Sequence, residues 1–135
     1  MKQKLFLILV FIFPIFSMAQ NNSTLNTTDK IYDWVPIEQK PEFPGGETAL
    51  LKYIGKNIKY PRKARWKGIQ GTTYINFVID KNGNVIDVVV AHGINSLLDA
   101  EAVRVIKSMP KWKPGKQEGK NVSVKYTVPI KFKLK

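Results

Sequence analysis

The last fourteen residues, 122–135, alternate between apolar and polar side chains without a break. The even positions are apolar, and the odd positions are serine, threonine, lysine or proline. Because successive side chains of a strand point to opposite faces, this pattern predicts one long strand with a core face and a solvent face. Pro129 has no N–H, and proline within sheets is confined mainly to edges, strand starts and bulges. The strand is therefore predicted to lie at the edge of a sheet.

A long edge strand bearing lysines has two interpretations, which the pattern alone leaves open. Lysine on an edge protects a sheet against pairing with other chains and adds solubility. An exposed edge also accepts an extended peptide as a new strand. Alternate residues direct N–H and C=O to opposite sides, so the odd positions share the side of Pro129. A docking peptide is therefore expected to pair with Ser123, Lys125 and Thr127, and its ladder to weaken at Pro129.

Hydrophobic spacing upstream predicts two longer helices and a short one. The longer helices are expected over 47–57 and from Ser96 to about Met109, and the short one over 62–67, directly after a proline. Ser96 begins a sequence that resembles a capping box, in which its hydroxyl accepts the N–H of Asp99.

A hairpin is predicted between these helices. Residues 72–80 alternate as a strand, and the Asn-Gly pair within 80–83 suits a tight turn because both residues accept positive φ. Ile86, Val88 and Val90 are expected to form the core face of the returning strand.

The order of elements predicts the fold class. A hairpin makes the first two strands antiparallel, and the helix that crosses back makes the third strand parallel to the second. The third strand then joins beside the first. We expect an α+β fold with a three-stranded antiparallel sheet in the order 2-1-3 and two helices packed on one face.

The N-terminus has the layout of a secretory signal peptide. Lys2 and Lys4 precede an apolar run over 5–16, and Ser17-Met18-Ala19 provides a small-residue exit. The run is shorter than the roughly 20 residues of a spanning helix, although an uncleaved inner-membrane anchor remains an alternative. We expect a signal peptide over 1–19, a flexible and proline-rich tether over 20–46, and one domain over 47–135.

Composition narrows the function classes. The chain has no cysteine, which excludes disulfides, thiol catalysis and thiolate metal sites. Its formal charge of +12 suits nucleic acid, anionic lipid or an acidic protein. Export from the cytoplasm argues against nucleic acid. Anionic cell-envelope polymers such as peptidoglycan or lipopolysaccharide remain a weaker alternative.

Candidate catalytic and metal-binding residues are few. Residues 80–83 resemble the start of a calcium loop, but position twelve of that loop would be Ala91 instead of glutamate. His92 is the only histidine and lacks a ligand partner at metal spacing. Asp99 and Glu101 sit at the start of a helix, where carboxylates interact favourably with the helix dipole. We expect no enzyme activity, no metal and no cofactor.

Seven motifs, in order along residues 37–134, resemble a known family. They are Pro41-Glu42-Phe43-Pro44-Gly45-Gly46, Tyr60-Pro61, Gly68-Ile69-Gln70-Gly71, Phe77-Val78-Ile79-Asp80 with Gly83, Leu98-Asp99-x-Glu101-Ala102, Met109-Pro110-x-Trp112-x-Pro114-Gly115 and Tyr126-Thr127-x-Pro129-Ile130. The chain is similar in these to the TonB C-terminal domain family, in a stand-alone form common among Bacteroidetes.

The resemblance implies a periplasmic binding module. Domains of this family grip the TonB box, the N-terminal peptide of outer-membrane TonB-dependent transporters, by strand addition to their last strand. The resemblance also places Tyr60 and Pro61 near the contact surface. The residues expected to bind a partner are therefore Tyr60, Pro61, Ser123, Lys125, Thr127, Pro129 and Lys131.

The chain departs from a complete energy transducer of this family. Such a transducer has an inner-membrane helix with a functional histidine and serine, followed by a long spacer. Here the N-terminal run contains no histidine, and a coil of roughly 25 residues averages only about 28 Å end to end. We therefore expect the binding step without energy transduction, with a short membrane-anchored transducer as the alternative.

Overall fold

The computed structural model describes residues 31–33 and 37–135. The predicted signal peptide and residues 20–30 and 34–36 of the predicted tether lie outside the described residues. The elements in chain order are β1 (Ile31–Asp33), α2 (Glu47–Asn57), α3 (Arg62–Trp66), β2 (Gly71–Ile79), β3 (Val85–His92), α4 (Ser96–Lys107), β4 (Gly115–Gln117) and β5 (Lys120–Phe132).

The sheet follows the order β1-β5-β2-β3, with β4 pairing with β5 off this path. β2 lies between β3 and β5 and is antiparallel to both, as the predicted order 2-1-3 requires. The prediction of three strands is wrong, because β1 adds a parallel partner to β5 and β4 forms a hairpin with the start of β5. Both additional strands are only three residues long, too short to leave a recognisable alternation in the sequence.

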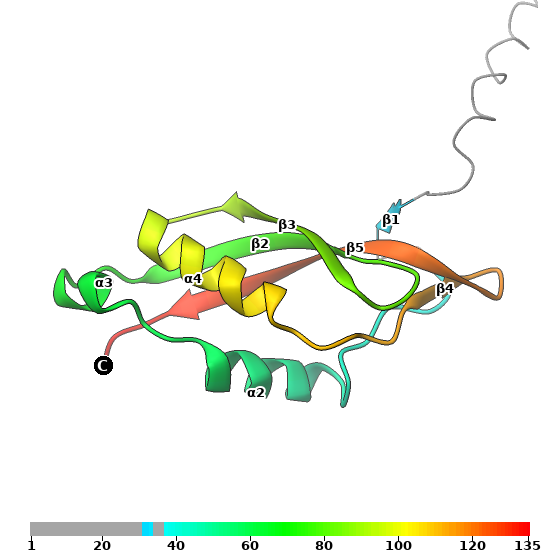
Figure 1. Ribbon diagram of the computed structural model, residues 1–135, viewed down its shortest axis with the longest axis horizontal. Coiled ribbons are helices and arrows are strands. Elements are labelled where there is room, and N and C mark those ends of the chain that lie inside the picture. Colours follow the sequence, from blue (N-terminus) through cyan, green and yellow to red (C-terminus); the bar gives the residue numbers. More distant parts are fainter. Residues whose placement is uncertain (1–30, 34–36) are drawn as a thin grey trace, which may run out of the picture. The chain divides into compact units, whose positions relative to one another are not determined.

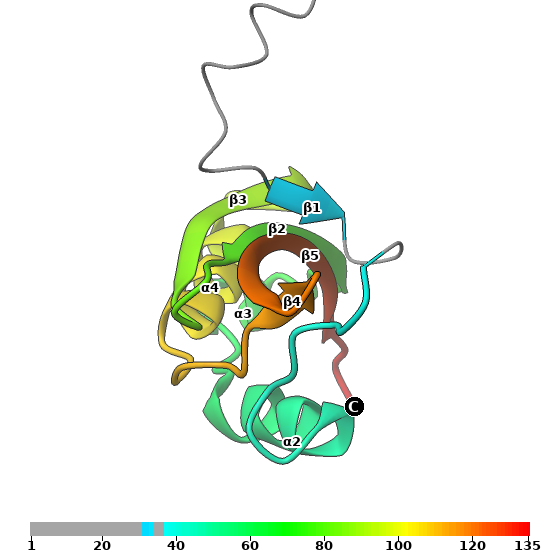
Figure 2. The same ribbon diagram turned by 90° about the vertical axis from the view of Figure 1, so that its right-hand side faces the viewer.

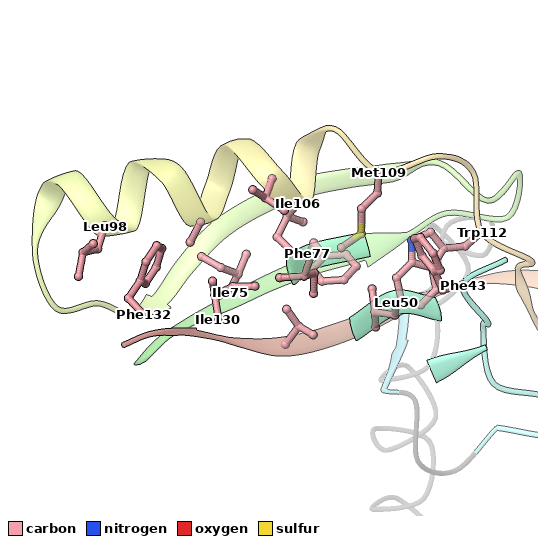
Figure 3. Packing of buried hydrophobic residues seen from close by; sticks show 14 of the residues in the cluster. Phe43, Leu50, Ile75, Phe77, Leu98, Ile106, Met109, Trp112, Ile130 and Phe132 are labelled. Atoms are coloured by element: carbon pink, nitrogen blue, oxygen red, sulfur yellow. The ribbon is translucent and has the colours of Figure 1, made fainter. Parts of the chain in front are cut away.

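The helices cover one face of the sheet. Figures 1 and 2 show β2 and β3 curving over α4, with α2 on the same side. Figure 3 shows the core that fills this space, in which Ile75, Phe77 and Ile106 lie between α4 and the strands. The even positions of β5 face the same core, as predicted: Val124, Val128, Ile130 and Phe132 are buried, and Tyr126 is partly buried.

The core face predicted for β3 is wrong in part. Ile86 and Val90 are 38% and 39% exposed, whereas Val85 and Val88 pack against the core. For Ile86 the cause is an irregularity between Asn76 and Val78 of β2, opposite which β3 contains one extra residue. Asp87, at this position, has a φ of 53°. A bulge of this kind shifts the inward-facing positions by one, so strict alternation from Ile86 fails. Val90 stands opposite the buried Ile75, and its exposure reflects the position of β3 at the end of the sheet.

The start of α4 also differs from the predicted capping box. Asn95, not Ser96, is the N-cap, and its side-chain oxygen accepts the N–H groups of Leu97 and Leu98 at 2.8 and 3.4 Å. Asp99 instead joins α4 to the sheet, because it accepts a 2.8 Å hydrogen bond from the hydroxyl of the fully buried Thr73. The helix ends at Lys107, two residues before the predicted end.

Residues 37–46, assigned from the sequence to the tether, pack against the domain. Gln39 and Glu42 form isolated antiparallel bridges with Lys116 and Lys113. Phe43 is 6% exposed and meets Trp112 edge to face, with ring centroids 5.5 Å apart. This segment therefore runs beside β4 and contributes to the core.

Candidate peptide-binding edge

The candidate site is the side of β5 that faces away from β2. β2 pairs with β5 in one continuous antiparallel register, from Gly71 opposite Phe132 to Ile79 opposite Val124. On the other side, β1 pairs in parallel with Ser123, Val124 and Lys125. The prediction that β5 is an open edge is therefore wrong for these three residues. Within the described residues, no strand pairs with this side of β5 beyond Lys125.

Pro129 indicates which backbone groups point to this side. It stands opposite Tyr74 of β2 and has no N–H to donate to it. Because N–H directions alternate along a strand, the odd residues are those whose N–H groups point away from β2. The N–H of Lys125 is then covered by β1. Thr127 and Lys131 keep donors on the open side, and Pro129 interrupts the row between them.

The predicted partner-binding residues do not form one cluster. Ser123 and Lys125 lie beside β1, whereas Thr127, Pro129 and Lys131 lie beyond it along the same strand. At about 3.4 Å per residue, Ser123 and Lys131 are separated by about 27 Å. The side chains of Lys125, Thr127, Pro129 and Lys131 are exposed on the face opposite the helices. There the hydroxyl of Thr127 donates a 2.6 Å hydrogen bond to the side-chain oxygen of Asn76.

Tyr60 and Pro61 lie at the far end of β5, directly before α3. The ring of Tyr60 meets Phe132 edge to face at 5.7 Å, and the guanidinium of Arg65 lies 5.2 Å from its centroid. The Tyr60 hydroxyl donates to the carbonyl of Ile69. These contacts hold the Tyr60 side chain against the end of the core.

A hollow of about 570 Å³ opens beside the middle of β5. Residues 39–43, Glu47 and Leu50 of α2, Trp112, Lys113, Tyr126 and Thr127 line it. The indole ring of Trp112 lies 5.1 Å from the ring of Tyr126 at its wall. Burial raises the pKa of Tyr126, and the nearby charge of Glu47 raises it further. The hydroxyl therefore stays protonated at neutral pH and is available as a hydrogen-bond donor.

Two buried donors at this hollow lack a partner among the described residues: the Trp112 indole N–H and the side-chain amide nitrogen of Gln39. Sequence reasoning missed the hollow and β1. In the sequence, Trp112 stands out only as part of a family motif. The hydrophobic pattern gives no indication that Gln39 lies close to Trp112. The bridges of Gln39 and Glu42 to Lys116 and Lys113 bring these distant segments together.

The described residues offer little for other chemistry. Among them, no group of three His, Cys, Asp or Glu side chains is arranged to hold a metal ion. No helix in the described part is both long and apolar enough to cross a membrane. The imidazole ring of His92 packs against the ring of Tyr74, with the two ring centroids 6.2 Å apart.

Comparison with known proteins decides the family. The sequence model of the family described as Gram-negative bacterial TonB protein C-terminal matches residues 56–134, more than half of the chain. The chain belongs to the TonB C-terminal domain family. Members of this family serve in energy transduction and binding in the cell envelope.

Relatives of this TonB C-terminal domain agree with the assignment. Protein TonB of Helicobacter pylori is 31% identical over 113 residues, covering 80% of this chain and 38% of the relative. Protein TonB of Pseudomonas putida is 27% identical over 95 residues, covering 67% and 38%. The chain thus spans less than two fifths of the length of these relatives. The solution structure of the H. pylori TonB C-terminal domain superposes with a TM-score of 0.52 at 28% identity, covering 68% of this chain and 87% of that one.

Proposed function

We propose that this chain is a periplasmic TonB-type binding module that takes up the TonB box of an outer-membrane TonB-dependent transporter as an extra strand on β5. Family membership supports a role in TonB-dependent transport. The observation that carries the mechanism is the row of backbone donors on the outer side of β5, which a neighbouring strand, β1, already uses over part of its length.

The position of β1 indicates where the peptide binds. Beyond β1 the open donors belong to Thr127 and Lys131, and Pro129 between them supplies none. The uninterrupted row runs through Ser123, Lys125 and Thr127, two of which pair with β1. A peptide that forms hydrogen bonds with all three of these N–H groups must therefore displace β1. A strand of only three residues is a weak competitor for a longer peptide.

The hollow beside Tyr126 and Thr127 adds side-chain selectivity to this backbone pairing. A strand lying along Thr127 directs alternate side chains toward the helix side, where the hollow opens. Tyr126, whose hydroxyl is a donor, lines the hollow, so a side chain with a hydrogen-bond acceptor is favoured.

The proposal places the chain in the periplasm after removal of residues 1–19. Processing would leave the domain free to meet a transporter peptide without an inner-membrane anchor. The intact mass of the protein recovered from a periplasmic extract tests this. A mass that retains residues 1–19 in the membrane fraction would favour the anchored transducer.

The binding step is tested by removing single backbone donors. An N-methyl amide at Thr127, introduced by semisynthesis, is expected to abolish binding of a synthetic TonB-box peptide and to leave the thermal unfolding midpoint nearly unchanged. The same modification at Tyr126 is the matched control. Its N–H points toward β2, where Tyr126 stands opposite Phe77, so that change is expected to damage the fold instead. Reversed outcomes would assign the wrong side of β5 to the peptide.

A further inference from the structure

Positive charge is concentrated at one end of the domain. Residues 59–71 and 131–135 contain eight lysines and arginines and no aspartate or glutamate. The rest of residues 37–135 contains eleven basic and eight acidic residues. Most of the net charge of the described domain therefore belongs to these two short segments, which we call the basic pole.

The two segments of the basic pole are neighbours in space. Gly71 stands opposite Phe132 in the sheet, and the backbone N–H of Leu134 donates to the side-chain oxygen of Gln70 at 2.9 Å. Figure 1 shows α3 and the C-terminal end of the chain at the same end of the domain, with β4 at the other. In the described part of the chain, none of the eight cationic side chains forms an ion pair.

Trp66 lies among the basic residues of the segment 59–71. It is the last residue of α3 and is 85% exposed, whereas Trp112 is 4% exposed in the core. The helix is held to the domain through Ala64, which is fully buried. Arg62, Lys63, Arg65 and Lys67 around it are all exposed. The domain thus presents an almost fully exposed indole ring to the surroundings, next to four cations.

We propose that the basic pole is a docking surface for a bilayer carrying anionic lipid headgroups. Lysine and arginine side chains are attracted to the negative surface potential of such a membrane. Tryptophan favours the headgroup level, where its indole ring is partly buried and its N–H remains hydrogen-bonded. A free phosphate or a single headgroup would be bound by the cations alone and would leave Trp66 in water. The combination fits an extended surface with a polar, anionic face and an apolar layer beneath it.

Trp66 and the cations of α3 are separate from the proposed peptide site at Ser123, Lys125 and Thr127, whereas three other predicted contact residues, Tyr60, Pro61 and Lys131, lie within the basic pole. α3 follows Tyr60 and Pro61, at the Phe132 end of β5, whereas β1 covers the opposite end of that strand. The same domain can therefore hold a membrane surface and a peptide at once. The inference does not depend on the peptide proposal.

The test measures binding to phosphatidylcholine vesicles prepared with and without phosphatidylglycerol, by sedimentation. Lys63→Glu combined with Lys67→Glu is expected to reduce binding to the anionic vesicles at least about tenfold, since each cation near such a surface contributes appreciably. Lys116→Glu combined with Lys120→Glu is the matched control, because it changes the net charge equally at the β4–β5 hairpin. All variants share one N-terminus, so its contribution cancels.

Trp66 provides a second measurement. Lipids brominated on the acyl chain are expected to quench part of the tryptophan fluorescence of the native chain, and Trp66→Phe is expected to lose that quenching. Trp66→Ala is expected to weaken vesicle binding several-fold and to leave TonB-box peptide affinity unchanged.

Three results would overturn the proposal. One is an equal loss of vesicle binding on charge reversal at the hairpin, which would mean non-specific attraction. Another is complete displacement by millimolar inorganic phosphate, which would indicate a free-anion site. The third is binding to isolated peptidoglycan, lost in the Lys63/Lys67 variant, with no vesicle binding, which would assign the basic pole to a polymer.

Discussion

Asp33 and Lys125 stand in register in the parallel pairing of β1 with β5. Lys125 is also in register with Val78 of β2 on its other side, so the last strand is flanked by two strands at this point. A strand marked by lysines and a proline is therefore an edge over only part of its length. β1 occupies part of the proposed peptide site, so binding there would be an exchange of one strand for another.

The exchange predicts that weakening β1 raises peptide affinity. Tyr32 is the central residue of β1, and Tyr32→Pro removes its backbone N–H. Because the odd residues of β5 direct their N–H and C=O groups toward β1, the N–H of Tyr32 is the one in β1 that points toward β5. We expect Tyr32→Pro to lower the Kd for a TonB-box peptide several-fold, measured by isothermal titration calorimetry. The cost of displacing β1 is then absent from the binding free energy.

Asp33→Pro is the matched control for this variant. Its N–H points away from β5 in the same register, so the pairing keeps its donors and affinity is expected to change less. Equal effects of the two prolines, or a loss of affinity in Tyr32→Pro, would contradict the exchange.

The core assignment predicts that Phe77→Asp unfolds the domain. Phe77 is 1% exposed and lies between Trp112 and Tyr126, with ring centroids 5.8 and 5.6 Å away. The substitution removes this packing and places an unpaired charge in the core, at a cost of about 4 kcal/mol or more. Circular dichroism melting measures the loss. Tyr74→Asp is the control, since Tyr74 is 42% exposed on the same strand and little destabilisation is expected there.

Loss of the hydrogen bond between Thr73 and Asp99 is expected to destabilise the domain less than Phe77→Asp does. Thr73→Val keeps the shape of the side chain but removes the donor of the 2.8 Å hydrogen bond to Asp99. Asp99 retains the N–H of Ile94 at 3.1 Å, so the carboxylate is not left without a partner. We expect a loss of about 1–2 kcal/mol in the free energy of unfolding, measured with urea. An unchanged midpoint would mean that this link between β2 and α4 adds no stability.

The lowered pKa of Glu101 predicts that the stability of the domain depends on pH. The hydrogen bonds that Glu101 accepts from Arg104 are the main cause of the lowered pKa, and the backbone N–H of Lys59 adds to them at 2.7 Å. A carboxylate with a lowered pKa in the folded state stabilises the fold above its unfolded pKa. That stabilisation disappears as the pH falls through the folded pKa.

Glu101→Gln should therefore destabilise the domain by about 1–3 kcal/mol at neutral pH. The difference from the native chain should vanish in acid, below the folded pKa of Glu101. Urea unfolding across the acidic range measures this, with Glu118→Gln as an exposed control. A difference that persists unchanged into acid would show that the charge of Glu101 is not its cause.

The parts of the fold that sequence predicted are those with a long, uniform period. Apolar and polar residues alternate over residues 122–135, so an inserted residue would break the pattern visibly, and the buried face of β5 was assigned correctly. The bulge at Asp87 was invisible for the opposite reason. Five of the six residues from 85 to 90 are apolar: Val85, Ile86, Val88, Val89 and Val90. Without an alternation of apolar and polar residues, the sequence cannot show that one residue is extra.

The candidate site was harder to predict than the fold. Pro129 identified the outer side of β5, because a missing N–H is a property of the residue itself. The partner on that side was not predictable, since β1 is three residues long and pairs with residues about ninety positions away. No local pattern records such a pairing. The hollow between Gln39 and Trp112 likewise depends on long-range packing of residues 37–43.

The most direct test of strand exchange is amide hydrogen exchange, followed by NMR on the chain with and without a TonB-box peptide. Strand exchange predicts that the peptide protects the N–H of Thr127 and, at the same time, removes protection from the N–H of Tyr32. The N–H of Tyr126, paired toward β2, should keep its protection throughout. If Tyr32 stays protected while the peptide is bound, or if protection appears away from β5, the peptide does not replace β1 and the proposed binding mechanism is wrong.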